Sequence, residues 1–168
     1  NKVSLSDFKG KKLLIVFYPG DETAVCTKQL CSYSSGFEDF QKLGIGIIGI
    51  NVDSIESHKK FKAKYKLAFP LLSDSDGKVC ELYKAKGLLG VKRSTYLLDE
   101  NQTIIFENEV LPLFYKDKDD IIGAIQKLVW RFSSHRDTVV SDVLQYFYSF
   151  ALFVRDADGK NWIQRKFL

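Results

Sequence analysis

Residues 13–31 have the sequence LLIVFYPGDETAVCTKQLC, and this stretch predicts the fold. Its first part, Leu13 to Tyr18, is apolar, β-branched and aromatic, which is typical of a strand buried on both faces of a parallel sheet. Pro19 and Gly20 end that strand. Polar residues that favour a helix start come next, and we expect a helix from near Thr23 to Gln41.

The alternation of strand and helix continues along the chain. An apolar run at 45–52 predicts a second buried strand, and Ser54 is expected to cap the helix after it. We then expect a short strand at 69–72 and a small helix at 77–83. Two strands joined by a turn should follow at 95–98 and 103–107, and an amphipathic helix at 117–128. This order predicts an α/β, thioredoxin-like sandwich with a central mixed sheet flanked by helices.

A chain of 168 residues has the size of one ordinary domain and can bury a core. We expect the α/β domain to occupy residues 1–128. Residues 129–168 do not follow its rhythm and are expected to add a C-terminal helix and strand. Because this extension is rich in Phe and Tyr, we expect it to pack on the domain or on a partner chain, for example in a homodimer.

The composition excludes several classes of protein. No run of eighteen apolar residues occurs, so no membrane-spanning helix is expected. The N-terminus lacks the apolar core of a signal peptide, which leaves the cytoplasm, or an organelle if a targeting segment has been removed. The net charge of +4 is spread along the chain. Its densest basic stretch, Lys59 to Lys66, is interpreted as the solvated face of a helix rather than a nucleic-acid site.

Three cysteines are too few, and odd in number, for a disulfide-stapled scaffold, and metal-ligand spacing is absent. His58 and His135 are isolated and are expected on the surface of helices. We therefore expect no metal and no other cofactor. Cys80 lies in an apolar, helix-like context and is expected to be structural.

Cys26 is the strongest candidate for a reactive thiol. It falls in the first turn of the helix expected after the first strand, at the strand end where open α/β sheets hold their ligands. The thiolate is the reactive form of cysteine, and the partial positive charge of a helix N-terminus favours it. The location therefore predicts a nucleophile.

Two residues before Cys26 each have a functional and a structural interpretation. Thr23 lies one helical turn earlier, so its hydroxyl could both donate to and accept from a small ligand, or it could simply cap the helix. Pro19 lacks an N–H and has a fixed φ, so it could rigidify the loop and shield the sulfur, or it could only end the strand.

Cys31 follows Cys26 by five residues, which on an intact helix corresponds to a rise of about 7.5 Å and a large angular offset. A disulfide needs Cα atoms within about 7 Å and converging side chains. Pairing of the two thiols would therefore require this part of the helix to unwind. The alternative is that Cys31 is an inert, half-buried helix residue.

The pattern Pro19-x-x-x-Thr23-x-x-Cys26 resembles the signature of the peroxiredoxins. The second cysteine, Cys31, makes the segment similar to the bacterioferritin-comigratory, or Q-type, atypical two-cysteine subfamily. The resemblance implies a thioredoxin-like fold and a thiol-dependent peroxidase.

Two further segments support this resemblance. Val3–Gly10 resembles the family's segment before the first core strand, and Gly90–Asp99 resembles its arginine-containing strand start. The similarity covers about residues 3–128. Family members usually have a short hairpin before the first of these segments, and residues 150–160 resemble that hairpin in pattern. One hypothesis is that the tail supplies this sheet edge, within the chain or to a neighbour.

By resemblance, the enzyme reduces hydrogen peroxide and small organic hydroperoxides, and thioredoxin or a similar dithiol regenerates it. The resemblance implies that Cys26 is the peroxidatic cysteine, that Cys31 is the resolving cysteine, and that Thr23 and Arg93 orient the peroxide beside Pro19. Arg93 fits this role because it is permanently cationic, and its several donors can stabilise a thiolate and polarise a peroxide. No metal, haem or nucleotide is implied.

Two other functions stay open. One is a thiol–disulfide exchange protein, although the chain lacks Cys-x-x-Cys. The other is a binding protein that uses the aromatic tail or the Lys59–Lys66 face. Neither explains why the motif residues Pro19, Thr23, Cys26, Cys31 and Arg93 occur together.

Overall fold

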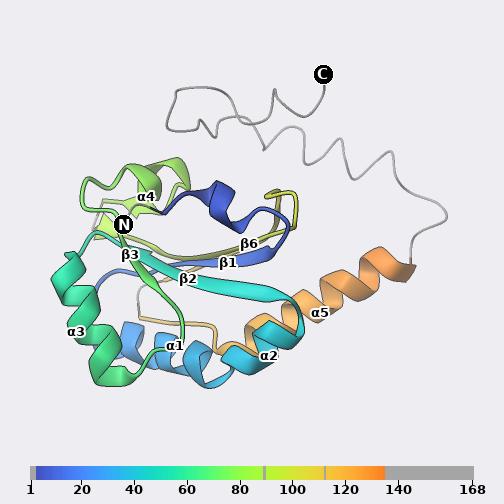
Figure 1. Ribbon diagram of the computed structural model, residues 1–168, viewed down its shortest axis with the longest axis horizontal. Coiled ribbons are helices and arrows are strands. Elements are labelled where there is room, and N and C mark those ends of the chain that lie inside the picture. The colour runs from blue at the N-terminus through green and yellow to red at the C-terminus, as the bar shows by residue number, and fades with distance from the viewer. Residues whose placement is uncertain (1–2, 89, 112, 135–168) are drawn as a thin grey trace. The chain divides into compact units, whose positions relative to one another are not determined.

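Figure 1 shows the computed structural model of the chain, which describes residues 3–88, 90–111 and 113–134. The chain divides into two compact units, Asn1–Gly123 and Ala124–Leu168, and the fold below is that of the first unit. The strand and packing expected for the C-terminal tail lie outside the described residues. Among the residues described, no helix has the length and hydropathy that crossing a bilayer requires.

The first unit is built on a five-stranded sheet in the spatial order β3 (Leu71–Ser73), β2 (Ile45–Asn51), β1 (Lys12–Phe17), β6 (Arg93–Leu98) and β7 (Ile104–Val110). β1, β2 and β3 are parallel to one another, whereas β6 is antiparallel to both β1 and β7. The sheet is therefore mixed, as predicted.

Helices cover both faces of this sheet (Figure 1). α1 (Ala24–Ser35), α2 (Phe37–Lys42) and α3 (Ile55–Tyr65) lie on one face. The 3-10 helix η1 (Leu5–Phe8) and α4 (Lys78–Leu82) lie on the other. This layering is that of a thioredoxin-like sandwich, as predicted.

Three short or C-terminal elements differ from expectation. β4 (Lys86–Gly87) and β5 (Gly90–Val91) form a two-stranded ribbon that is too short to give a periodic pattern in the sequence. α5 (Lys118–Ser134) runs past the expected helix end at residue 128 and crosses from the first unit to the second. The predicted domain boundary at that residue thus falls inside a helix, and the extension beyond it stays a prediction.

The single helix expected from Thr23 to Gln41 is wrong, because the chain breaks at Gly36 between α1 and α2. Gly36 has φ −96° and ψ 11°, outside the helical region. The aliphatic part of Lys118 comes within 2.5 Å of the place where a β-carbon at this residue would lie. A side chain at this position would therefore meet a residue far away in the sequence, and the apolar spacing along the segment does not reveal the break.

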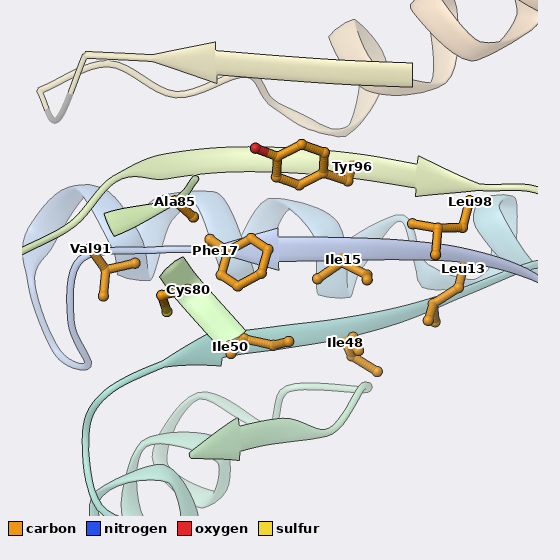
Figure 2. Packing of buried hydrophobic residues seen from close by; sticks show 10 residues of the cluster. All are labelled: Leu13, Ile15, Phe17, Ile48, Ile50, Cys80, Ala85, Val91, Tyr96 and Leu98. Carbon is orange, nitrogen blue, oxygen red and sulfur yellow. The ribbon is translucent and has the colours of Figure 1, made fainter. Parts of the chain in front are cut away.

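A continuous apolar cluster lies between the sheet and α4 (Figure 2). Alternate residues of β1 enter it, and the ring of Phe17 packs on Tyr83 and Tyr96 with centroid distances of 5.3 and 5.8 Å. The remaining buried members come from β2, β6, α4 and its neighbours: Ile48, Ile50, Cys80, Ala85, Val91 and Leu98. Because β1 is buried along nearly its whole length, packing in this cluster fixes the position of the strand.

Candidate active site

The loop after β1 leads directly into α1. β1 ends at Phe17, α1 begins at Ala24, and Cys26 is the third residue of that helix. Since β1 and β2 are parallel, they end at the same edge of the sheet, where ligand sites of α/β folds form. The structure confirms the position of Cys26 in the first turn of a helix beyond a buried strand.

Arg93, the first residue of β6, contacts the sulfur of Cys26. Because β6 is antiparallel to β1 and pairs Ser94 with Phe17, its start lies beside the end of β1. Nη2 of Arg93 donates to Sγ of Cys26 at 3.3 Å. The two residues are 2% and 0% exposed, so water does little to screen the guanidinium charge. This contact places a buried positive charge directly at the sulfur of Cys26.

Two further residues of α1 hold Arg93 in place, and together with Cys26 and Arg93 they form what we call the Cys26 cluster. Nη1 of Arg93 donates to Oε1 of Gln29 at 2.5 Å, and Nε2 of Gln29 donates to the hydroxyl of Tyr33 at 3.1 Å. That hydroxyl in turn donates to the carbonyl of Lys116 at 2.8 Å. Burial raises the pKa of Tyr33 to about 12, so the phenol remains a donor at neutral pH.

The sequence analysis did not identify Gln29 and Tyr33 as site residues. A signal was nevertheless present, because they lie three and seven residues after Cys26, on the same face of a helix. A buried glutamine at such a spacing requires a polar partner. The identity of that partner, Arg93, depends on the register of β1 and β6.

Thr23 and Pro19 lie in the loop between β1 and α1. Thr23 is the N-cap residue of α1 by backbone position, but its hydroxyl makes no capping bond and donates to the carbonyl of Gly20 at 3.3 Å. The residue is exposed, so its oxygen can still accept a hydrogen bond from a small ligand. Pro19 is half-buried directly after the strand. The structure thus places both residues next to the helix turn that carries Cys26.

Cys31 lies on α1 with Cys26, and the helix is continuous between them. All three cysteines are free thiols. Cys31 is half-buried, and this burial raises the pKa of its thiol. The folded helix therefore keeps Cys31 protonated and apart from Cys26, in agreement with the geometry expected from their spacing.

Cys80 has a different environment. It is fully buried in the apolar cluster of Figure 2. Burial, and then the neighbouring Asp74, raise the pKa of the Cys80 thiol to about 12. This agrees with a structural role.

The expectation that His58 lies on the surface is wrong. It is 4% exposed, and its Nδ1 lies 2.8 Å from Oδ2 of Asp21 in the loop before α1. A signal was available, since His58 precedes Phe61 and Tyr65 by three and seven residues, and Phe61 is buried on α3. His135 lies outside the described residues.

The basic face of α3 agrees with its interpretation as a solvated surface. Of the lysines between Lys59 and Lys66, only Lys62 is half-buried, where it donates to the carbonyl of Phe69 at 2.9 Å. Lys64 pairs with Glu22 at 2.7 Å across the surface. Within the described part of the chain, no group of three His, Cys, Asp or Glu side chains could hold a metal ion.

Comparison with known proteins adds sequence similarity to this geometry. The AhpC/TSA family model matches residues 1–107. The chain is 44% identical to chloroplastic peroxiredoxin Q of Sedum lineare over 131 residues, which covers 75% of this chain and 69% of that relative. It is 42% identical to the putative peroxiredoxin bcp of Coxiella burnetii over 110 residues, which covers 61% and 73% of the two chains.

Two solved structures share the fold. The first is the bacterioferritin comigratory protein of Xanthomonas campestris, solved in work on its alkyl peroxide reduction activity. It is 28% identical, with a TM-score of 0.68 over 77% of this chain and 85% of that one. The second is a cysteine-to-serine mutant of Xylella fastidiosa PrxQ, which is 26% identical with a TM-score of 0.68 over 77% and 82%.

Proposed function

Because this chain belongs to the AhpC/TSA family and is a thiol-dependent peroxidase of the peroxiredoxin Q type, we propose that Cys26 is the thiol that reduces peroxide. The observation that carries this assignment is the 3.3 Å contact between Arg93 and the sulfur of Cys26. Of the three cysteines, Cys26 alone has a guanidinium recorded at its sulfur, and it lies in the first turn of a twelve-residue helix. Both features place positive electrostatic potential at the sulfur that would attack the peroxide.

In the first step, the thiolate of Cys26 attacks one oxygen of the hydroperoxide. The S–O bond forms as the O–O bond breaks, which leaves a sulfenic acid on Cys26 and an alkoxide or hydroxide that takes up a proton. Arg93 can donate to the peroxide as charge develops on the departing oxygen. Thr23 offers a hydroxyl at the start of the same helix, and Pro19 rigidifies the loop beside it.

In the second step, Cys31 resolves the sulfenic acid. Its thiolate attacks the sulfur of Cys26, a disulfide forms, and the hydroxide that leaves is protonated to water. The intact helix prevents this reaction, so α1 must unwind between the two cysteines. Unwinding also removes the burial that raises the pKa of Cys31, which makes that thiol a better nucleophile only when it is needed.

Peroxiredoxins act on peroxides and are reduced by thioredoxin-like partners. For this chain we propose hydrogen peroxide and small organic hydroperoxides as substrates, which the alkyl peroxide reduction of the Xanthomonas relative supports. A dithiol such as thioredoxin would reduce the Cys26–Cys31 disulfide and become oxidised itself. The chloroplastic relative supports an organelle as one location, with the cytoplasm as the alternative. A homodimer stays a prediction.

The test is peroxide consumption with NADPH, thioredoxin and thioredoxin reductase. We expect Cys26→Ser to abolish turnover. Cys31→Ser should consume about one peroxide per chain and then stop, because its sulfenic acid has no partner. Cys80→Ala is the matched control and should turn over like the wild type.

Other outcomes would reject parts of the proposal. Full turnover by Cys31→Ser would mean that an external thiol resolves Cys26. If the wild type reduced insulin disulfides but consumed no peroxide, the thiol–disulfide exchange alternative would replace the peroxidase.

A further inference from the structure

A second buried hydrogen-bond network is centred on Asp21, in the loop that precedes α1. We call it the Asp21 cluster, and it consists of Asp21 and its four donors, Tyr18, Asn51, Ser57 and His58. Asp21 accepts four hydrogen bonds through its carboxylate, and its side chain is 3% exposed. Oδ1 accepts from Tyr18 Oη at 2.8 Å and from Asn51 Nδ2 at 3.3 Å. Oδ2 accepts from Ser57 Oγ at 2.7 Å and from His58 Nδ1 at 2.8 Å.

These donors come from three separate parts of the fold. Tyr18 follows β1, Asn51 ends β2, and Ser57 and His58 belong to the first turns of α3. The backbone N–H of Asp21 is also held, because it donates to Oδ2 of Asp53 at 2.7 Å. Asp21 therefore joins the loop to two strand ends and to a helix through buried hydrogen bonds.

The loop needs such an anchor. Glu22, the next residue, has a φ of 58°, in the left-handed region that residues other than glycine adopt at a cost. Thr23 follows, and the bond recorded for its hydroxyl goes to Gly20 within the same loop. The contacts of Asp21 thus fix a strained segment that carries Pro19 on one side and Thr23 on the other.

The orientation of His58 follows from its partner. A carboxylate oxygen only accepts hydrogen bonds, so Nδ1 of His58 must carry the proton. Its Nε2 is buried without a hydrogen-bond partner among the described residues, so the bond to Asp21 is the polar contact that fixes the ring. Burial, and then Asp21, raise the pKa of Tyr18, so that phenol also stays a donor.

The Asp21 cluster and the Cys26 cluster support different parts of the site. Arg93, Gln29 and Tyr33 act on the sulfur and on α1, whereas the donors around Asp21 act on the loop. The hydrogen bonds recorded within each cluster share no residue with the other. Loss of one cluster should therefore leave the hydrogen bonds of the other in place. The two clusters are linked through charge at Tyr18, because burial and Asp21, and to a smaller extent Cys26, raise the pKa of that phenol.

We propose that Asp21 and His58 are positioning residues that hold the loop from Pro19 to Thr23 in the shape that orients the peroxide, without setting the reactivity of the Cys26 thiolate. The inference rests on the function proposed above. It predicts a selective defect, because a peroxide must be oriented by the loop whereas a simple alkylating agent such as iodoacetamide reacts with the thiolate without such orientation.

The experiment compares two rate constants of reduced Cys26 in each variant, one with hydrogen peroxide and one with iodoacetamide. In His58→Leu, the rate constant with peroxide should fall about tenfold, since small misplacements of a reacting group have large effects on rate. The rate constant with iodoacetamide should stay within about twofold of the wild type. His58→Asn can place an amide N–H near the position of Nδ1 and should recover most of the loss.

Two other variants distinguish a positioning role from a general loss of folding. Ser57→Ala removes a single donor from Asp21 and should lower the peroxide rate constant by about threefold. Lys60→Ala is the matched control, exposed on the same helix, and should change neither rate constant. Circular dichroism and thermal unfolding establish that each variant is folded.

The results distinguish failure of the positioning role from failure of the Cys26 assignment. If both rate constants fell together in His58→Leu and Ser57→Ala, or if neither fell, the positioning role would be overturned while the peroxidase assignment stood. If Cys26→Ser reacted with peroxide as fast as the wild type, the assignment of Cys26 itself would fail, and with it the inference.

Discussion

Cys26 and Cys80 occupy the same position in two different helices, and the charge beside each one differs. Each is the third residue of its helix, and each is 0% exposed. The guanidinium of Arg93 contacts the sulfur of Cys26 at 3.3 Å. The carboxylate of Asp74 instead lies beside Cys80 and accepts from its backbone N–H at 2.7 Å. Because burial and helix position are shared, we expect the neighbouring charge to decide which of the two thiols is reactive.

The helices also differ in length. α1 has twelve residues, whereas α4 has five and begins after Gly77, which has a φ of 69°. A longer helix adds more aligned peptide dipoles, so α1 favours an anion at its N-terminus more than α4 does. Charge and helix length act in the same direction, and both separate Cys26 from Cys80.

The largest expected effect comes from removal of the charge that distinguishes the two thiols. Arg93→Met should lower the rate constant of Cys26 with hydrogen peroxide by about a hundredfold, because a positioned donor to the developing anion is lost. Arg93→Lys keeps a charge without the two-pronged geometry and should lose less. The rate constants can be measured by competition with a haem peroxidase. A rate constant for Arg93→Met near that of the wild type would show that Arg93 does not cause the difference.

A smaller effect is expected from the residue that holds Arg93. Gln29→Ala leaves Nη1 of Arg93 without this acceptor, and we expect a fall in the peroxide rate constant of about tenfold. Tyr33→Phe removes a hydrogen bond one step further from the sulfur and should have less effect. The same competition assay measures both variants. Equal losses in the two would contradict an effect that decreases along this chain of hydrogen bonds.

Substitution of Cys80 should have little effect on peroxide reduction. Cys80→Ala should keep the peroxide rate constant within about twofold and lower the free energy of unfolding by about 1 kcal/mol, since it removes a buried side chain from the core. In the folded wild type at pH 8, iodoacetamide should label Cys26 and leave Cys80 unlabelled, as mass spectrometry can show. Labelling of Cys80 at a comparable rate would remove the distinction between the two sites.

The smallest effect concerns stability at alkaline pH. The pKa of Cys80 rises from the usual 9.0 to about 12, so the folded state keeps a proton that the unfolded chain loses. The free energy of unfolding should therefore fall as pH rises above about 9. Tyr33 and Tyr83, whose pKa values rise from 10.0 to about 12, add to the fall above pH 10.

Cys80→Ala should lose less stability than the wild type between pH 9 and 10, measured by urea unfolding. If the wild type and Cys80→Ala lost the same free energy of unfolding over this range, the raised pKa of Cys80 would not be the cause.

Local sequence patterns predicted most of the fold. The expected strands at 13–18 and 45–52 agree with β1 and β2 to within a residue at each end, because buried strands have a strong apolar signal. Ser54 caps α3 as expected, with its hydroxyl accepting from the N–H of Ser57. The failures concern residues with non-local contacts. Lys118 packs at Gly36, where the helix breaks, and Asp21 pairs with the buried His58.

The sequence by itself determined the α/β order, the place of Cys26 at a helix start and the five-residue spacing to Cys31, because all three depend on residues close together in the chain. Only the tertiary structure decided which charge faces each thiol. The antiparallel register of β6 against β1 brings Arg93 to Cys26, 67 residues away, and the packing of α3 brings His58 to Asp21, 37 residues away. Such pairings depend on strand register and helix packing, which local patterns do not specify.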